Sequence, residues 1–337
     1  MTQSATPHRV LYFTLDGEVG RAREILARRG VASQIELVGC AHAPYESPTA
    51  EQLAGCEAVI GEFMPVRGEA VDAFARSGVR LVASMSIGIN HVDVRGLAER
   101  GVLVSNCPGY CALDVANHAV ALMLDLMRKV TLSNRDVLRG GWDPKVGYTI
   151  HRPQGQTLGL VFFGHIAREV APIAQALGMR VLVWAPTKTA AQLADAGCEK
   201  AETLDELLRA SDVVSLHCPL IPETKRLIGA RELALMKPTA YLVNTARGEC
   251  VDEDALVAAL DEGLASGGAR GICAAGIDTL AHEASGRNER LVRHPRVVVT
   301  PHSAYESLEA ADALREMSLE AVCEHLLEGR APTNLVA

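Results

Sequence analysis

Short apolar runs alternate with amphipathic stretches through the first hundred residues of the chain. The runs at residues 8–15, 56–63, 79–86 and 102–109 are HRVLYFTL, CEAVIGEF, VRLVASMS and VLVSNCPG, and helical patterns separate them. Apolar runs of this length between helical patterns predict parallel strands joined by crossover helices. We therefore expect a doubly wound α/β domain in this part of the chain, with right-handed crossovers.

The pattern changes after Tyr110. Residues 112–141 form one long helical pattern that ends at a glycine pair, and a second series of apolar runs begins near residue 158 and continues to residue 304. The last stretch, residues 307–332, predicts an amphipathic helix. The chain is therefore expected to be an α/β protein with two doubly wound, parallel-sheet, Rossmann-like domains. Periodicity alone assigns the last helix to the second domain.

Length and charge narrow the classes of function. The chain has 337 residues, of which 48% are hydrophobic and 22% charged, so two domains with sizeable cores are expected. The formal net charge is -8, and the basic residues are not clustered. Because binding to nucleic acid requires a basic face that neutralises phosphates, we expect no direct nucleic-acid partner. A single well-placed arginine can still bind a small anionic substrate.

Targeting signals and cysteines point to the cytoplasm. The N-terminal residues lack the continuous apolar segment of a signal peptide, and no apolar run reaches transmembrane length. The nine cysteines are scattered; Cys107 and Cys111 lie one helical turn apart, but no second pair accompanies them. We therefore expect no membrane association, no zinc or other metal site, and reduced thiols in a cytoplasmic protein.

Residues 158–186, LGLVFFGHIAREVAPIAQALGMRVLVWAP, have the outline of a dinucleotide-binding strand, turn, helix and strand. The three glycine positions of the G-x-G-x-x-G pattern fall on Phe162, Gly164 and Ala167, so only the middle glycine is present. Phenylalanine at the first position costs about 1–2 kcal/mol if the turn needs a positive φ. The motif alone therefore leaves two interpretations open, a reshaped dinucleotide site or an ordinary turn between strand and helix.

The end of the next strand bears on the choice between NAD and NADP. An NAD site normally presents an acidic residue to the ribose hydroxyls there, whereas this chain has Ala185. Thr187 and Lys188 follow at once and can supply a hydroxyl and a cation to a 2′-phosphate. This combination favours NADP over NAD, although Lys188 is equally compatible with a solvated surface position.

Three chemically distinct side chains follow predicted strands of the second series. Arg247 ends YLVNTARG, Glu283 lies in AAGIDTLAHEA, and His302 lies in VVVTPHSA. An arginine can bind a substrate carboxylate at two points, a histidine can exchange a proton with a carbonyl oxygen, and a carboxylate can orient the imidazole. Singly, these residues could be a helix cap, a solvated acid and a core histidine. Together they favour hydride transfer to a 2-keto acid.

Several segments resemble one enzyme family. Residues 84–94 (SMSIGINHVDV), 217–229 (HCPLIPETKRLIG), 235–248 (LMKPTAYLVNTARG) and 300–304 (TPHSA) are similar to motifs of the D-isomer-specific 2-hydroxyacid dehydrogenases. Residues 106–128, NCPGYCALDVANHAVALMLDLMR, also resemble the branch related to the C-terminal-binding protein corepressors. The resemblance covers most of the chain.

This resemblance implies a discontinuous fold. Residues 1–106 and 303–337 would form a flavodoxin-like substrate-binding domain, and residues 107–302 a Rossmann dinucleotide-binding domain. The last helix then belongs to the first domain, in contrast to the assignment from periodicity. Members of the family commonly form homodimers through their cofactor domains, so residues 116–127 are candidates for an interface.

The resemblance also assigns roles to individual residues. Arg247 would clamp the substrate carboxylate, His302 would act as acid and base, and Glu283 would be its partner. The loop of Ser86, Ile87 and Gly88 would offer backbone N–H groups to the substrate. The residues expected to bind NAD or NADP are Phe163, Gly164, His165, Ile166, Ala185, Thr187, Lys188, Cys218, Pro219, Thr224, Thr245, Ala246 and Asp278.

Departures from the family pattern concern the cofactor more than the catalytic residues. Besides Phe162, Ala167 and Ala185, they are Ile221 at a frequent threonine, Asn117 at a frequent acid, and Ala284 where a proline usually follows the glutamate. We therefore expect an active NAD(P)-dependent oxidoreductase that interconverts a small D-2-hydroxy acid and its 2-keto acid. The alternatives are a dinucleotide-binding sensor or corepressor-like protein with little turnover, and a protein in which Phe162 blocks the nucleotide.

Overall fold

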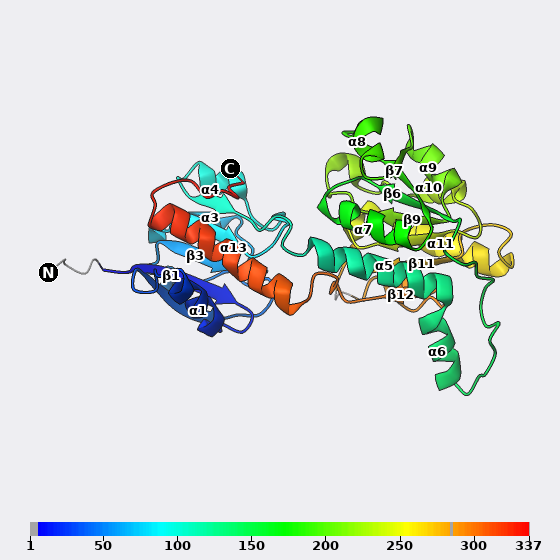
Figure 1. Ribbon diagram of the computed structural model, residues 1–337. Helices are drawn as coiled ribbons and strands as arrows, with labels where there is room; N and C mark the ends of the chain where they lie inside the picture. Colours follow the sequence, from blue (N-terminus) through cyan, green and yellow to red (C-terminus); the bar gives the residue numbers. More distant parts are fainter. Residues whose placement is uncertain (1–5, 284–285, 337) are drawn as a thin grey trace. The chain divides into compact units, whose positions relative to one another are not determined.

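The computed structural model describes residues 6–283 and 286–336, which divide into two compact units (Figure 1). The first unit takes in the chain up to Tyr110 and again from Ser307, and the second is Cys111–Glu306. Ala284, the residue found in place of the family's proline, lies outside the described residues. In the described part of the chain, no helix has the length and apolar character needed to cross a membrane.

The first unit is built on a five-stranded parallel sheet with the order β2-β1-β3-β4-β5. Strands β3 and β4 are buried along their whole length, as expected for a parallel sheet covered on both faces. The strands are β1 (His8–Thr14), β2 (Ile35–Ala41), β3 (Ala58–Gly61), β4 (Leu81–Ser84) and β5 (Leu103–Ser105). The helices are α1 (Gly20–Arg28), α2 (Ala50–Leu53), α3 (Glu69–Ser77), α4 (Val94–Ala98) and α13 (Leu308–Leu326).

The last helix, α13, belongs to the first unit. Its buried residues Leu314, Leu319 and Val322 share a hydrophobic cluster with Val10 of β1 and Leu81 of β4. The assignment of this helix from periodicity alone is therefore wrong. Periodicity identifies the apolar face of a helix but not the distant part of the chain against which that face packs.

The second unit is built on a seven-stranded parallel sheet with the order β12-β11-β10-β9-β6-β7-β8. The chain moves outward from β6 to β8, then returns to the other side of β6 and continues from β9 to β12, so the strand order reverses between β6 and β9. The strands are β6 (Thr157–Val161), β7 (Arg180–Trp184), β8 (Glu199–Lys200), β9 (Val213–Leu216), β10 (Tyr241–Asn244), β11 (Ala274–Ile277) and β12 (Val297–Val299).

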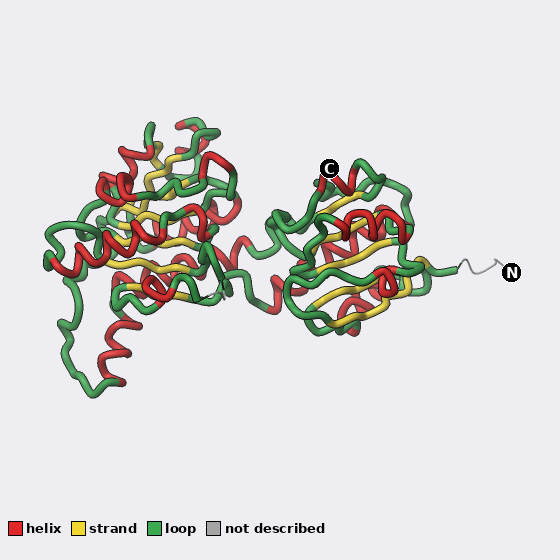
Figure 2. Tube along the Cα trace, turned by 180° about the vertical axis from the view of Figure 1, so that it is seen from behind, coloured by secondary structure: helices red, strands yellow, loops and turns green. Residues whose placement is uncertain are grey.

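Helices cover both faces of this sheet (Figure 2). They are α5 (Ala112–Arg128), α6 (Val130–Leu138), α7 (His165–Ala176), α8 (Ala190–Ala194), α9 (Leu204–Ala210), α10 (Ala230–Leu235), α11 (Glu253–Ala265) and α12 (Glu289–Val292), with short 3₁₀ turns at Pro222–Thr224 and Gly248–Cys250. One hydrophobic cluster joins α5 and α7 to one face, and a second joins α9, α10 and α11 to the other. The prediction of two doubly wound α/β units is confirmed.

The long helical pattern at residues 112–141 is interrupted, contrary to the prediction. Lys129 has a φ of 57°, and α5 ends and α6 begins at this residue. The Asp125 carboxylate accepts the N–H of Thr131 at 2.7 Å, and the Lys129 ammonium donates to the carbonyl of Val146 at 2.8 Å. These two hydrogen bonds stabilise the chain where the helix is interrupted. The apolar periodicity continues through this position and therefore does not reveal the interruption.

Candidate active site

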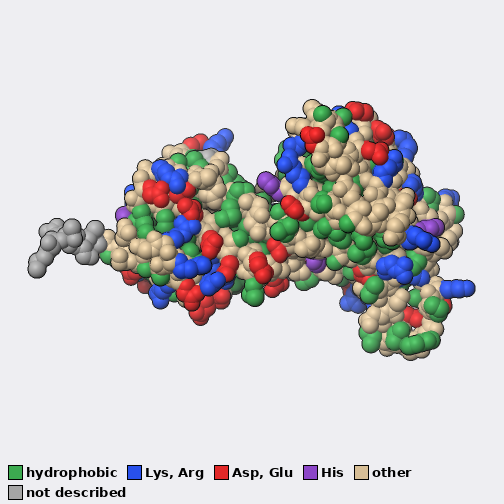
Figure 3. Space-filling model, viewed as in Figure 1, with side chains coloured by type: hydrophobic (Ala, Val, Ile, Leu, Met, Phe, Trp, Pro, Cys, Tyr) green, Lys and Arg blue, Asp and Glu red, His purple; other side chains and the backbone are tan. Residues whose placement is uncertain are grey.

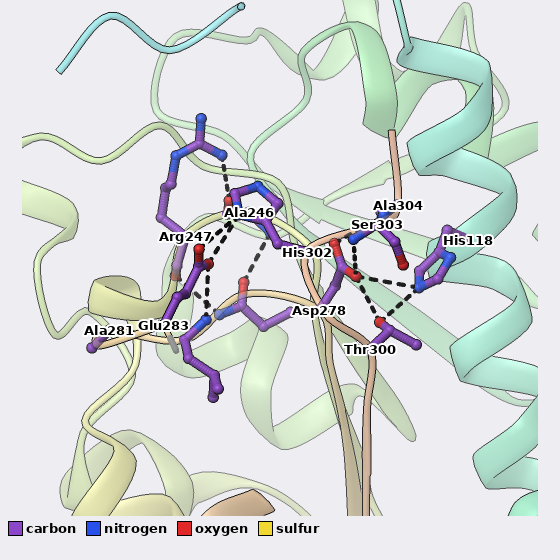
Figure 4. A network of polar contacts seen from close by, with 12 residues as sticks. His118, Ala246, Arg247, Asp278, Ala281, Glu283, Thr300, His302, Ser303 and Ala304 are labelled. Atoms are coloured by element: carbon purple, nitrogen blue, oxygen red, sulfur yellow. Dashed lines mark hydrogen bonds and ion pairs between the residues drawn. The ribbon is translucent and has the colours of Figure 1, made fainter. Parts of the chain in front are cut away.

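The loops after three neighbouring strands bring Arg247, Glu283 and His302 together within the second unit (Figure 4). Arg247 follows β10, Glu283 follows β11 and His302 follows β12, and these strands are adjacent in the sheet. The His302 Nδ1 atom lies 2.9 Å from the Glu283 Oε1 atom. The Arg247 guanidinium donates one hydrogen bond to the carbonyl of Ala246 at 2.7 Å. The three side chains that the sequence singles out therefore lie on one edge of one sheet.

Asp278 holds the turn that carries His302. Its buried carboxylate accepts the hydroxyl of Thr300 at 2.6 Å, the N–H of Ser303 at 3.0 Å and the N–H of Ala304 at 3.2 Å. The His302 N–H donates to the Asp278 carbonyl at 2.8 Å. His302 has a φ of 52°, a conformation that L residues keep only when the surroundings impose it. Asp278 therefore positions the imidazole through the backbone.

His118 and Thr300 are polar site residues that the sequence analysis missed. The Nε2 atom of His118, on α5, lies 2.9 Å from the Thr300 hydroxyl and 3.5 Å from the Asp278 carboxylate. His118 extends the network of Asp278 and Thr300 across to the neighbouring helix (Figure 4). The one available signal was a histidine beside the buried face of an otherwise apolar helix, which is more often a structural feature.

The charges around Glu283 set its ionisation. Partial burial raises the pKa of this carboxyl, but the hydrogen bond and positive charge of His302 outweigh burial, with smaller help from the Leu280 N–H and the Arg247 charge. The net pKa of Glu283 is lowered from its ordinary value, so the carboxylate is ionised near neutral pH. It contacts the Nδ1 side of the His302 ring, which leaves Nε2 as the atom able to exchange a proton with a substrate.

The turn between β6 and α7 has, at Phe162, the positive φ that glycine supplies in the usual dinucleotide pattern. Phe162 has a φ of 71°, the conformation that glycine normally supplies, at a strain of about 1–2 kcal/mol. A Cβ atom added at Gly164 would meet nothing within 4 Å, and no side chain caps the N-terminus of α7. The first-turn N–H groups of α7 are therefore free of a side-chain cap and suited to a phosphate.

The other residues of this turn divide between core and surface. Phe163 is buried in the α5 and α7 cluster with the Arg168 guanidinium over its ring, so only its backbone can serve a ligand. Ala167 is fully buried in the same cluster, His165 is exposed at the start of α7, and Ile166 is half-buried.

The end of β7 carries no acid. Ala185 is buried, and the turn after it is closed by a hydrogen bond from the Lys188 N–H to the Ala185 carbonyl at 3.1 Å. Thr187 is exposed and Lys188 is half-buried. Thr187 and Lys188 thus lie in the turn directly after Ala185, the position at which the sequence analysis expects the ribose.

The loops after β9 and β10 hold the remaining predicted cofactor residues. Pro219 is exposed, and the buried Thr224 donates its hydroxyl to the Pro219 carbonyl at 2.5 Å, so this hydroxyl supports the loop. Cys218 is buried with its Sγ atom 3.6 Å from the Sγ atom of Cys250, and the hydrogen bond with Cys250, together with burial, raises the pKa of its thiol. Ala246 is buried next to the buried Thr245.

The hydroxyl of Thr245, in the loop after β10, is one of the buried polar side-chain groups that make no hydrogen bond within the described residues. Together with the open position at Gly164 and the uncapped start of α7, this unpaired hydroxyl fits a ligand with phosphate and hydroxyl groups such as a dinucleotide. Among the described residues, no group of three or more His, Cys, Asp or Glu could hold a metal ion.

The predicted substrate loop lies in the first unit. The carbonyls of Ser86, Ile87 and Gly88 accept hydrogen bonds from the Cys107 N–H, the Asn106 amide and the Ser86 hydroxyl. The Ser86 N–H donates to the Ser84 carbonyl, whereas the N–H groups of Ile87 and Gly88 have no acceptor among the residues described. Two of the three predicted N–H donors therefore remain available to a carboxylate.

Comparison with known proteins agrees with this geometry. The sequence pattern described as D-isomer specific 2-hydroxyacid dehydrogenase, NAD binding domain, matches residues 120–304. A glyoxylate reductase of Korarchaeum cryptofilum is 35% identical over 303 residues, covering 87% of this chain and 86% of its own. A hydroxypyruvate reductase of Blautia hydrogenotrophica is 33% identical over 263 residues, covering 77% of this chain and 78% of its own. The apo structure of D-lactate dehydrogenase from Escherichia coli has a TM-score of 0.81 at 27% identity, covering 98% of this chain and all of its own.

Replacement of His302 by alanine tests the electrostatics of the pair. Because His302 supplies two of the contributions that lower the pKa of Glu283 while burial raises it, we expect this pKa to rise in His302→Ala. Carbon-detected NMR titration of the Glu283 carboxyl measures the change. Arg247→Met is the matched control and should raise the same pKa by less, since Arg247 is the weaker cause. A Glu283 pKa that stays low in His302→Ala would contradict the pairing.

Proposed function

Because the chain belongs to the D-isomer-specific 2-hydroxyacid dehydrogenase family, we propose that it reduces a small 2-keto acid of the glyoxylate or hydroxypyruvate type. The chain is an NAD(P)-dependent oxidoreductase that interconverts 2-keto acids and D-2-hydroxy acids. The choice of substrate rests on the activities named for two relatives, and the observation that carries it is the His302–Glu283 pair beside Arg247.

In this proposal, Arg247 binds the substrate, and His302 transfers the proton with Glu283 as its partner. Arg247 pairs with the substrate carboxylate through its two-point guanidinium. In the first unit, the free N–H groups of Ile87 and Gly88 are suited to hydrogen-bond to a carboxylate. His302 donates the proton on Nε2 to the carbonyl oxygen during reduction and accepts it during oxidation. Glu283 holds and orients the imidazole through Nδ1. A bound reduced nicotinamide supplies the hydride.

The dinucleotide would be held by the second unit. The Gly164 backbone and the first turn of α7 suit the pyrophosphate, and the unpaired Thr245 hydroxyl suits a polar group of the nicotinamide half. We retain the proposed domains, residues 1–106 with 303–337 for the substrate and 107–302 for the dinucleotide. The two compact units of the structure meet after Tyr110 and after Glu306. Each of these boundaries lies four residues beyond the proposed one, which supports this division.

We propose a preference for NADP over NAD. No carboxylate stands at the end of β7 to accept the ribose hydroxyls or repel a 2′-phosphate. The half-buried Lys188 and the exposed Thr187 can supply a cation and a hydroxyl at this position. A 2′-phosphate would therefore be attracted by the Lys188 ammonium and would meet no carboxylate that repels it.

The alternative of a corepressor-like sensor with little turnover stays a prediction that rests on the resemblance of residues 106–128. We favour the enzyme because Arg247, Glu283 and His302 are all present and gathered. We also propose a reducing, cytoplasmic location, which is supported by the lack of disulfide bonds among the nine cysteines, all of them within the described residues.

A homodimer is a further part of the proposal. Helix α6 has no buried residue, and Val137, Leu138 and Trp142 are 46%, 78% and 87% exposed at its end and in the loop that follows. Apolar side chains gather there on the surface (Figure 3). Most of the apolar residues in 116–127, in contrast, pack in the unit's own core. The exposed end of α6 is therefore a better candidate for the interface than α5.

The enzyme proposal is tested by following NADH and NADPH absorbance with glyoxylate, hydroxypyruvate and pyruvate. We expect turnover with at least one of the first two acids. His302→Ala should lower kcat by about 10²–10⁴-fold, the usual contribution of a general acid, while the Kd for the nucleotide stays within about twofold. Tight nucleotide binding without turnover of any acid would instead favour the sensor.

Ala185→Asp tests the preference between nucleotides. The added carboxylate should repel a 2′-phosphate and accept ribose hydroxyls, so the ratio of kcat/KM for NADPH to that for NADH should fall about tenfold or more, equivalent to about 1.4 kcal/mol. Thr203→Asp, at the exposed N-cap of α9, is a matched control for added charge and should leave the ratio unchanged. A ratio that is the same in Ala185→Asp and wild type would refute the placement of the ribose.

Sedimentation equilibrium tests the proposed homodimer. Wild-type protein should have twice the mass of one chain, and Leu138→Asp should shift it toward the monomer because the introduced carboxylate would be buried. Leu308→Asp, which replaces another leucine that is 85% exposed, is the control. Dissociation by both variants or by neither would count against an interface at the end of α6.

A further inference from the structure

Phe162 and Trp184 form an aromatic pair at the point where the strand order reverses. The Phe162 N–H donates to the Trp184 carbonyl at 2.8 Å, and the N–H of His217, just after β9, donates to the carbonyl of Val161 at 3.0 Å. Phe162 therefore lies at the carboxyl end of β6, between the ends of β7 and β9. Ligands of open α/β sheets bind at this place.

The Phe162 ring is held in a defined orientation. Its centroid is 5.7 Å from that of Trp184, and the planes are at 85°, an edge-to-face contact that aromatic pairs favour. Both residues are half-buried against the cluster on the α9, α10 and α11 face. The backbone keeps a φ of 71° to place the ring there, a conformation that glycine would adopt without strain.

The surroundings of the ring suit a flat, apolar group. Leu220, in the loop after β9, is half-buried against the same apolar cluster as Phe162 and Trp184, whereas Ala185 packs in the cluster on the other face of the sheet. In a dinucleotide site, the end of the second strand borders the ribose of the adenosine half of the ligand, and Trp184, which contacts Phe162, ends that strand here. Adenine is the flat group of that half, and bases stack readily on aromatic side chains.

We propose that Phe162, braced by Trp184, is an adenine-stacking residue that binds the adenosine half of the cofactor. This inference rests on the dinucleotide site of the proposed function and adds a contact made by a residue that replaces a glycine. Stacking also explains why a strained phenylalanine is compatible with a binding turn. The same ring placed over the crevice would instead exclude the nucleotide, and the two cases predict opposite effects of removing it.

The test measures each half of the cofactor separately by calorimetry. ADP-ribose carries the adenine, and reduced nicotinamide mononucleotide carries the other half. Phe162→Gly, which the backbone accepts without strain, should weaken ADP-ribose binding about tenfold, the loss of one stacked base, and leave the mononucleotide affinity unchanged. Phe162→Tyr keeps the ring and should keep the wild-type affinity. In a Trp142→Phe background, Trp184 is the single tryptophan, and its fluorescence should respond to ADP-ribose but not to the mononucleotide.

Tyr45→Gly is the matched control. Tyr45 is an exposed aromatic residue with a φ of 68° and an edge-on aromatic neighbour, Phe63, in the first unit. The same substitution there should leave ADP-ribose binding unchanged. Equal or tighter ADP-ribose binding by Phe162→Gly would overturn the stacking role. ADP-ribose binding needs no turnover, so that result leaves the reductase proposal intact, whereas an inactive wild-type enzyme with the expected binding pattern would refute only the reductase proposal.

Discussion

The buried carboxylate of Asp278 makes the interactions on which the edge of the sheet that carries Arg247, Glu283 and His302 depends. It accepts hydrogen bonds from Thr300, Ser303 and Ala304, and the carbonyl of the same residue accepts the N–H of His302. A turn with a positive φ at a histidine would otherwise relax. Only with this turn fixed does Nδ1 of His302 meet Glu283, and only then is Nε2 left to exchange a proton. His118, on α5, contacts Thr300 and Asp278, so this network connects α5 to the ends of β11 and β12.

The sheet carries the two groups of proposed site residues on different strands. Strands β10, β11 and β12 are followed by Arg247, Glu283 and His302, whereas β6, β7 and β9, which flank the place where the strand order reverses, are followed by the proposed nucleotide turn and its neighbours. The departures Phe162, Ala167 and Ala185 from the usual dinucleotide pattern all belong to the second group. Substitutions in the second group need not move Arg247, Glu283 or His302. This separation is compatible with a complete Arg247, Glu283 and His302 trio beside an unusual turn after β6.

Several features could be predicted because they are local. The alternation of apolar runs with helical patterns depends only on residues adjacent in the sequence, and it correctly predicted two parallel sheets. Residues that follow buried strands share one edge of a sheet, so Arg247 and His302 could be expected near each other before any coordinates. The cost of a phenylalanine at the first glycine position also follows from backbone sterics alone, and φ of Phe162 is indeed positive.

By itself, then, the sequence determined the α/β class, the strand ends that carry the chemistry and the family to which the chain belongs. Only the tertiary structure decided that α13 packs on the first sheet, that Lys129 breaks the long helix, and that His118 reaches Thr300 from another element. It also decided that the Phe162 ring rests edge-on against Trp184. The physical reason is that these contacts join residues far apart in the chain, and periodicity specifies which face of an element is apolar but not which distant partner that face or side chain will meet.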